Sequence, residues 1–394
     1  MAAHHLFSEG GCGSLGESFL PRNTTSFTVA GAGVFGAWIA YTLRRAGHAV
    51  TLLDPFGPAH SCASSGGESR IIRASYGTDE IYTRMAVRSL ALWETFFAET
   101  NRRQLFQRTG VLWLTEPDDA HANASRVALR NAKVDFEDLS PADVRRRYPQ
   151  INAASGVGAI FEKNAGAIMA RQAVQAVVEE FTRIGGEYRH AALRRPEEED
   201  TRASVLIYAC GPWLGKLFPD LLGRRIFLSR QEVLFFGVPP GDFRFQSPQL
   251  PVWLDFGSQR AMYGFPDLEA RGFKLACDRH GPPIDPDTAD RLVSPETIQQ
   301  MRSYLSERFP ALAHAPIVDA RVCQYENTSN GDFILDRHPT LENVWFAGGG
   351  SGHGFKHGPA VGEYLARMIT SAHASPESRF LFSTKATAQS RVVY

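Results

Sequence analysis

Residues 26–36 read SFTVAGAGVFG, and this stretch decides the fold. Its first five residues have the composition of a short apolar strand, and the spacing of apolar residues predicts a helix from Val34 to Ala46. Residues 48–54, HAVTLLD, predict a second strand that ends in an acid. A strand, a glycine-rich turn, a helix and a second strand form the nucleotide-binding unit of a doubly wound α/β fold.

The glycines of this unit have separate tasks. Gly31 allows the tight turn, Gly33 lets the backbone approach a pyrophosphate, and Gly36 permits close packing of helix on strand. The acid at the end of the second strand can accept a hydrogen bond from a ribose hydroxyl. These features predict a dinucleotide site, although they do not distinguish NAD from FAD. The candidate cofactor-binding residues of the unit are Gly31, Gly33, Val34, Phe35, Gly36 and Asp54.

A second glycine-rich junction lies near the C-terminus, where residues 348–356 read GGGSGHGFK. The apolar run 343–347 before it predicts a buried strand, and residues 359–369 after it have helical spacing. Backbone amides at such a junction, together with the positive end of a helix dipole, face an anionic or electron-rich group. Two junctions in one chain indicate a cofactor with phosphates at one end and a ring system at the other. FAD fits that description.

Composition limits the other possibilities. The 394 residues are enough for two domains, and lysine plus arginine equal aspartate plus glutamate at 42 each, which gives no electrostatic support for nucleic acid or membrane binding. No apolar run approaches the length of a membrane span. Residues 1–26 are expected to form a loosely ordered tail without a secretory signal. The five cysteines are odd in number and irregularly spaced, which argues against disulfides and structural zinc and for a reducing cytoplasm.

The loop that follows Asp54, residues 55–73, is polar and carries two arginines that a nicotinamide dehydrogenase does not need. It resembles the flavin-contacting loop of the D-amino-acid-oxidase superfamily, in particular its monomeric sarcosine oxidase branch, which includes oxidases of N-methyl amino acids, pipecolate and fructosyl amino acids. The resemblance continues in order to about residue 370. Its further motifs are YGFP at 263–266, GFKL at 272–275, CQYENT at 323–328 and DFILDRHP at 332–339.

The resemblance implies an α/β fold with two domains, in which a Rossmann-like FAD/NAD(P)-binding domain is interleaved with an antiparallel-sheet substrate domain. The FAD-binding domain would comprise residues 27–80, 165–215 and 325–394, and the substrate domain residues 81–164 and 216–324. Local patterns agree with this outline. They predict a helix at 170–183, strands at 187–193 and 205–210, and antiparallel strands within 225–280.

The resemblance also implies roles for individual residues. Cys323 matches a cysteine that holds FAD through a thioether, although a free cysteine is more often a small buried hydrophobe. Arg73 and Lys356 match a pair that binds the substrate carboxylate, and Lys274 matches a lysine that promotes the reaction of the reduced enzyme with oxygen. Tyr263 and Tyr325 match pocket-lining aromatics, and Arg70 is expected beside the ring. Further cofactor contacts are expected at Ser64, Gly350, Gly352, His353, Gly354, Phe355 and Lys356, with His353 as a structural hydrogen-bonding group.

The implied reaction is the oxidation of a secondary amine or amino acid by hydride transfer from the carbon next to nitrogen. The resulting imine hydrolyses, and oxygen is reduced to hydrogen peroxide. The resemblance also implies a monomer, and no metal is expected. Two alternatives remain open: a dehydrogenase that passes electrons to an acceptor other than oxygen, and a flavin-binding protein without turnover.

Two departures from the family pattern bear on these expectations. Gly66 and Asp278 stand where sarcosine oxidases have histidines, so a substrate that is bulkier than sarcosine or cationic is expected. Residues 194–204, RRPEEEDTRAS, form a short charged linker where the family has a small β-meander, and its loss is expected to weaken non-covalent FAD binding.

Overall fold

The computed structural model describes residues 25–153, 156–192, 194–196, 204–257 and 261–390. Residues 1–24 of the expected tail lie outside these ranges. So does most of the charged linker at 194–204. Within them, no helix is long and apolar enough to cross a membrane.

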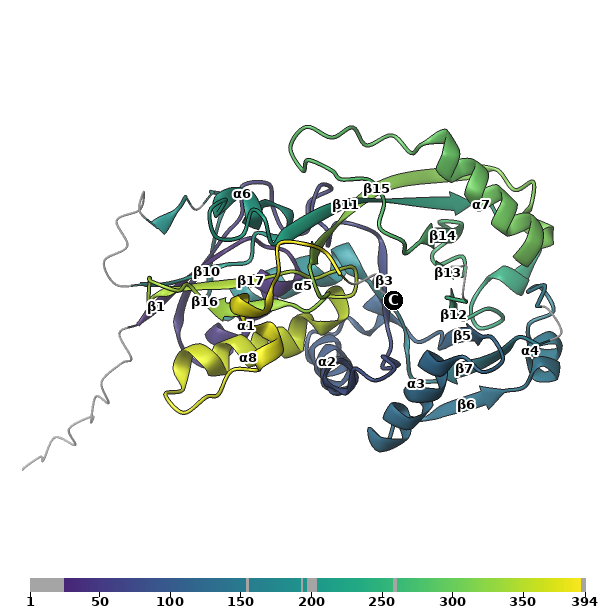
Figure 1. Cartoon of the computed structure of the whole chain (residues 1–394), viewed down its shortest axis with the longest axis horizontal. Helices are drawn as coiled ribbons and strands as arrows, with labels where there is room; N and C mark the ends of the chain where they lie inside the picture. The colour runs from purple at the N-terminus through teal and green to yellow at the C-terminus, as the bar shows by residue number, and fades with distance from the viewer. Residues whose placement is uncertain (1–24, 154–155, 193, 197–203, 258–260, 391–394) are drawn as a thin grey trace, which may run out of the picture.

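Two large sheets make up most of the molecule (Figure 1). The first has six strands, which are parallel except for the antiparallel pair β16–β17. Its central strand β1 pairs with β2 and β10, so that Val29 lies opposite Leu52 and Ile207. In spatial order the strands are β16 (Ile334–Arg337), β17 (Val344–Gly348), β10 (Ser204–Tyr208), β1 (Ser26–Ala30), β2 (Ala49–Leu53) and β9 (Glu187–Arg189).

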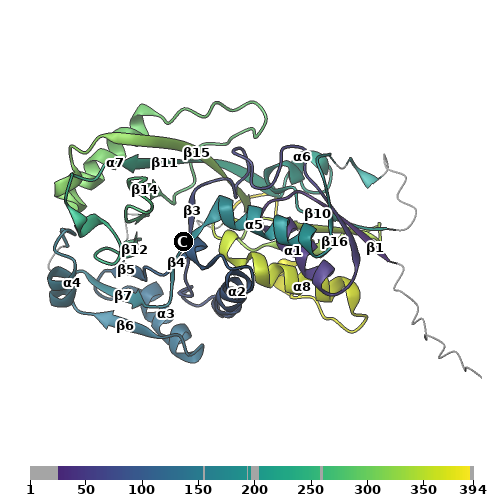
Figure 2. The same ribbon diagram turned by 180° about the vertical axis from the view of Figure 1, so that it is seen from behind.

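Helices α1 (Val34–Arg45) and α8 (Gly358–Thr370) lie side by side against this sheet, with α5 (Ala170–Arg183) and α2 (Glu80–Glu99) beside them (Figures 1 and 2). Close packing of α8 on α1 depends on two glycines. A Cβ on Gly358 would lie 2.6 Å from Val34, and one on Gly362 would lie 2.8 Å from the carbonyl oxygen of Trp38. This packing brings the two glycine-rich junctions, which are more than 300 residues apart, to neighbouring positions.

The second sheet has eight strands. All its pairs are antiparallel except β12–β5, which is parallel. The alternation in residues 225–280 therefore predicted the strands there correctly, whereas the parallel pairing with a strand from residues 111–115 was not expected. In spatial order the strands are β15 (Ile317–Thr328), β11 (Ile226–Phe236), β14 (Phe273–Cys277), β13 (Met262–Phe265), β12 (Val252–Asp255), β5 (Val111–Thr115), β7 (Gly158–Glu162) and β6 (Phe136–Leu139).

Helix α7 (Pro295–Arg308) packs against the second sheet, and α3 (Ala120–Asn131) and α4 (Pro141–Arg147) lie near β6 and β7. A small third sheet, β3 (Ser69–Ile72), β8 (Gly166–Met169) and β4 (Phe106–Gln107), lies between the two large ones (Figure 2). The long strand β15 passes through residue 325, where a domain boundary was expected, and its last residues approach the first sheet. The mixed α/β architecture with a Rossmann-like sheet confirms the predicted fold class.

Candidate functional site

The first junction is held in shape by two glycines that have no space for a side chain. Gly31 has φ +99°, and a Cβ there would collide with the carbonyl of Ala209. A Cβ on Gly36 would collide with the carbonyl of Gly31, so α1 can begin directly beneath the turn only because residue 36 is glycine. Both positions therefore serve the geometry of the turn itself.

Gly33 and Asp54 face the space above the turn. A Cβ on Gly33 would meet a single protein atom within 4 Å, the hydroxyl of Ser65 at 3.6 Å, so the chain itself does not require glycine there. A group that approaches the backbone from the open side would require it. The carboxylate of Asp54 is buried and accepts hydrogen bonds from the amides of Ala32 at 2.8 Å, Phe56 at 2.8 Å and Gly57 at 2.9 Å.

A cavity of about 380 Å³, here called the cofactor cavity, extends between the two glycine-rich junctions. Its lining includes eleven of the cofactor-binding residues expected from the sequence: Gly31, Gly33, Val34, Phe35, Asp54, Ser64, Arg70, Gly350, Gly352, Gly354 and Phe355. Gly36 lies behind the turn, and Cys323, His353 and Lys356 line an adjoining space instead. The N-terminus of α1 and the carboxyl ends of β1 and β10 face this cavity, which is where an α/β sheet binds a dinucleotide.

The adjoining space, here called the substrate chamber, measures about 80 Å³. It shares Arg70, Tyr325, Gly352 and Phe355 with the cofactor cavity, so the two are adjacent. Five of the six residues predicted to be catalytic line it together with Asp278: Arg70, Arg73, Tyr263, Tyr325 and Lys356. They come from β3, the loop after it, β13, β15 and the second glycine-rich junction.

Two buried cations dominate the substrate chamber. The guanidinium of Arg73 stacks on Tyr76 and Trp113, with its carbon 4.8 and 4.9 Å from the ring centres. Lys356 donates from Nζ to the hydroxyl of Tyr76 at 2.8 Å and to the carbonyl of His353 at 3.0 Å. Burial, followed by the charge of Arg73, holds the pKa of Lys356 well below its ordinary value. An anionic ligand that reached this pair would relieve the repulsion and restore the charge on the lysine.

Asp278 is the carboxylate that faces these cations. Its Oδ1 accepts a hydrogen bond from the hydroxyl of Tyr325 at 2.7 Å, and Tyr325 in turn interacts with Tyr263. Burial raises the pKa of Asp278 to about 6, opposed by the Tyr325 hydrogen bond and by the charges of Arg73 and Lys356. The substrate chamber therefore combines two cations with one titrating acid, and it complements a zwitterion better than a simple anion.

Lys274, the remaining residue predicted to be catalytic, lies outside the substrate chamber. It lines a smaller cavity of about 40 Å³, here called the lysine chamber, together with Gly66, Arg70 and Cys323. Its Nζ donates to the carbonyl and hydroxyl of Ser69 at 2.9 and 3.1 Å. Burial lowers the pKa of Lys274 to about 7, with a further contribution from Arg70. Among the described residues, no carboxylate forms a salt bridge with this lysine.

Cys323 lines both the substrate chamber and the lysine chamber. Its Sγ lies 3.5 Å from Nη2 of Arg70 and 3.9 Å from the carbonyl oxygen of Ser64. Gly66, one of the two departures from the family pattern, lies in the lysine chamber and not in the substrate chamber, so of the two departures only Asp278 faces the substrate chamber. A Cβ at position 66 would collide with the carbonyl of His60.

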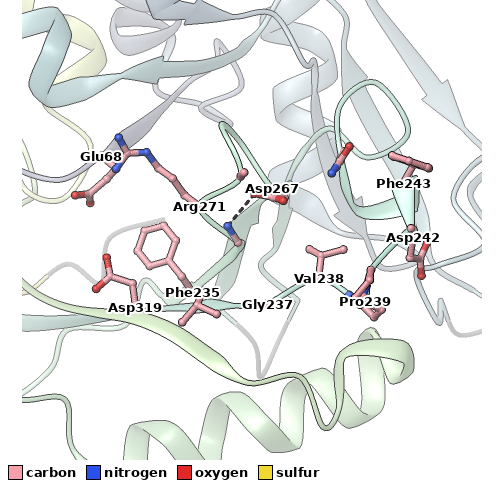
Figure 3. Close-up of a pocket in the computed structure, with 16 residues that line it drawn as sticks. Glu68, Phe235, Gly237, Val238, Pro239, Asp242, Phe243, Asp267, Arg271 and Asp319 are labelled. Carbon is pink, nitrogen blue, oxygen red and sulfur yellow. Dashed lines mark hydrogen bonds between the residues drawn. The ribbon is translucent and has the colours of Figure 1, made fainter.

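A wider cavity of about 490 Å³ opens beyond the lysine chamber (Figure 3). Phe235 and Glu68 line both spaces, and Figure 3 shows Arg271 extending toward Glu68 at one end of the wider cavity. None of the residues expected at the site lines this wider cavity. Lys274 does not line it, so the two cavities share these two wall residues only.

Several residues of the site were not foreseen from the sequence. The hydroxyl of Tyr76 hydrogen-bonds to Lys356, His353 and His357. Glu162 fixes the loop after Arg73, because its carboxylate accepts from the amides of Ala74 and Ser75 at 2.7 and 3.1 Å. Neither residue belongs to a motif, and no local signal could have found them. In the cofactor cavity the additional lining residues include Ser65, His60, Trp213, Lys216 and Glu326.

A Rossmann-type turn at one end of a long cavity, and a chamber of buried cations at the other, define a dinucleotide-dependent oxidoreductase. A family model described as "DAO: FAD dependent oxidoreductase" matches residues 26–368, and the chain belongs to this family. It is thus an FAD-dependent oxidoreductase. The open side of Gly33, the α1 N-terminus and the glycines at 350–354 fit such a cofactor.

Individual relatives agree with this assignment. The chain is 32% identical over 377 residues to a monomeric sarcosine oxidase of Streptomyces avermitilis, covering 91% of this chain and 97% of the relative. It is 30% identical to a peroxisomal sarcosine oxidase of Homo sapiens, covering 86% and 90%. Among solved structures, an L-proline dehydrogenase of P. horikoshii has the same fold, with a TM-score of 0.75, 20% identity and coverage of 88% and 93%.

Proposed function

We propose that this protein oxidises a small secondary amine or amino acid that carries a carboxylate, with oxygen as the electron acceptor. The observation that carries this proposal is the buried pair of basic side chains, Arg73 and Lys356, in a chamber that adjoins the cofactor cavity. Burying two positive charges side by side is costly, and an anionic ligand that bound between them would offset that cost. Relatives named sarcosine oxidase, at 32% and 30% identity, support the same substrate class.

Each residue of the substrate chamber contributes to binding and orientation. The Arg73 guanidinium can donate two parallel hydrogen bonds to the substrate carboxylate, and Lys356 adds a point charge. Tyr263 and Tyr325 enclose the rest of the substrate and exclude water, and Asp278 faces its amine. FAD, when bound, supplies the acceptor for the hydride that leaves the carbon next to nitrogen. The substrate amine must be neutral when the hydride leaves. A group of the substrate chamber therefore has to take up the proton of the amine before that step.

The remaining assignments complete the proposal. Cys323 holds the cofactor through a thioether, and Lys274 supplies a fixed positive charge where oxygen is reduced. The substrate loses a hydride and a proton and leaves as an imine, which water hydrolyses. Oxygen gains two electrons and two protons and leaves as hydrogen peroxide. The enzyme acts as a monomer in the cytoplasm.

A peroxide-coupled screen of N-methyl, cyclic and glycated amino acids tests the function. We expect one peroxide for each substrate molecule consumed, because the proposal assigns both electrons to oxygen. Reduction of an artificial dye without peroxide would contradict the oxidase and indicate a dehydrogenase. Purified protein whose yellow colour does not fade with any of these compounds in the absence of oxygen would contradict the proposed substrate class.

Asp278 is expected to set substrate preference. Replacing it with alanine leaves Arg73 and Lys356 without their facing carboxylate, so binding of substrates with an additional positive charge should weaken. We expect kcat/KM for a lysine-type substrate to fall about 10- to 100-fold relative to that for sarcosine or proline, since truncating a buried charged partner costs about 2–5 kcal/mol at most and water will reduce that effect. An unchanged ratio between the two substrate types would rule out this role for Asp278.

A further inference from the structure

Asp278 is the single carboxylate among the described residues that line the substrate chamber. It directly follows β14, and its amide donates to the carbonyl of Ala261 at 2.6 Å, which ties it to the start of β13. The hydroxyl of Tyr325 holds its Oδ1. No described residue donates to the other oxygen, Oδ2, and 8% of the residue's surface stays accessible. Oδ2 can therefore accept a hydrogen bond from a ligand in the chamber.

The other titratable groups around Asp278 are poor acceptors for a proton of the substrate. Burial raises the pKa of Tyr263 and of Tyr325, so both hydroxyls keep their protons. Both ring nitrogens of His353 are engaged, one by the hydroxyl of Tyr76 at 3.3 Å and one by a backbone carbonyl at 3.1 Å. The remaining charged or titratable groups of the chamber wall and of the adjoining chain are Arg70, Arg73, Lys356, Cys323, Arg279 and His280.

Two of these groups, Arg73 and Lys356, connect the basicity of Asp278 to substrate binding. Burial raises the pKa of Asp278 to about 6, and the hydrogen bond from Tyr325 and the charges of Arg73 and Lys356 oppose that rise. A substrate carboxylate bound to the two basic side chains would neutralise them and remove part of this opposition. Asp278 would then become a stronger base in the same event that brings the substrate amine into the chamber.

We infer that Asp278 is the catalytic base that takes the proton from the substrate amine before the hydride leaves. An N–H bond of the ammonium breaks, its electron pair stays on nitrogen, and an O–H bond forms at Oδ2 of Asp278. The proton stays inside the chamber, because a zwitterion and a carboxylate become an amino acid anion and a carboxylic acid. The inference rests on the proposed function, since it requires an amine that carries a carboxylate.

Anaerobic reduction of the holoenzyme, followed by stopped flow with the most active substrate of the peroxide screen, tests the inference. In the wild type the second-order rate constant should fall below about pH 6, where Asp278 is protonated, and stay nearly constant above it. In Asp278→Asn only substrate that is already neutral in solution reacts, so the constant should rise about tenfold per pH unit. At neutral pH the variant should be about 100- to 1000-fold slower. Asp135→Asn, at an exposed aspartate beside Lys163, should follow the wild type.

Two further measurements distinguish a base from a residue that only supports the structure. Proline and thiazolidine-4-carboxylate differ by one ring sulfur, which lowers the pKa of the amine, so the second compound needs less help from a base. Asp278→Asn should therefore lose reduction by proline at neutral pH and keep reduction by thiazolidine-4-carboxylate within about threefold. Tyr325→Phe removes a hydrogen bond that lowers the pKa of Asp278, so the fall at low pH should move to higher pH.

Acetate, which has a carboxylate and no amine, tests the coupling without turnover. Because an ionised Asp278 repels a second carboxylate, the Kd of acetate, measured from the flavin absorbance, should rise more steeply with pH in the wild type than in Asp278→Asn. Equal rate constants for the wild type and Asp278→Asn at every pH, or equal losses with both ring compounds, would overturn the inference alone. A wild-type flavin that no compound of the screen reduces would overturn the proposed function, and the inference with it.

Discussion

Replacing Cys323 with serine is expected to abolish covalent attachment of the flavin. The Sγ atom lies 3.5 Å from Nη2 of Arg70, a residue that also lines the cofactor cavity, so the sulfur lies beside that cavity. A serine hydroxyl at the same place ionises far less readily and forms no thioether. Wild-type protein should keep its yellow colour in the acid-precipitated pellet and show an intact mass increased by one FAD. The Cys323→Ser protein should release all its colour into the supernatant.

The matched control is Cys277→Ser, at a cysteine on the adjacent part of the same sheet that lines neither the cofactor cavity nor the two small chambers. Its flavin should stay in the pellet. Wild-type protein whose flavin is released completely by acid would exclude the thioether, whatever the activity of the enzyme.

The Rossmann-like half of the fold could be predicted from the sequence because its signals are local. The glycine spacing at 31, 33 and 36 constrains the turn by sterics alone, and the structure places strand and helix boundaries within two residues of those expected from Ser26 to Asp54. The strand expected at 187–193 is shorter, ending at Arg189, because it is an edge strand that pairs with β2 through three residues only. Leu193 lies outside the described residues.

The parts that were missed depend on contacts between distant segments. The apolar run of β12 identifies a strand but carries no information about its neighbour, so its parallel pairing with β5, more than 130 residues away, could not be predicted. Glu162 accepts a hydrogen bond from the amide of Ser75, in the loop after Arg73, although 87 residues separate the two. No sequence pattern near Glu162 predicts this contact. Glu326 lies inside a recognised motif, yet nothing in that motif predicts that its carboxyl is buried with one oxygen unpartnered among the described residues.

The basic side chains of the site lie in two separate cavities, which indicates two separate functions. The substrate chamber holds Arg73 and Lys356, whereas the lysine chamber holds Lys274, and Arg70 and Cys323 line both. The substrate carboxylate would neutralise Arg73 and Lys356. Lys274 would then keep its positive charge, because no carboxylate among the described residues forms a salt bridge with it. This separation predicts that substrate oxidation and oxygen reduction depend on different lysines.

Replacing Lys274 with methionine is therefore expected to slow reoxidation by oxygen about 100- to 1000-fold, the usual loss when one fixed electrostatic stabiliser is removed. Methionine has a similar length and removes the charge, which in the wild type lies 4.4 Å from the ring centre of Phe265. Anaerobic reduction by substrate should change by less than about threefold, because Lys274 does not line the substrate chamber. Stopped-flow measurement of the two half-reactions separates the effects.

The pH dependence supplies an independent check of the same charge. A lysine whose pKa is lowered to about 7 by burial carries its proton below that pH and loses it above. The rate constant for wild-type reoxidation should therefore fall as pH rises through about 7 toward the level of Lys274→Met, and the variant should show no such step. Lys163→Met, at an exposed lysine paired with Asp135 and Glu137, should reproduce the wild-type curve. Equal losses in both half-reactions, or full oxygen reactivity in Lys274→Met, would contradict the assignment of Lys274 to oxygen.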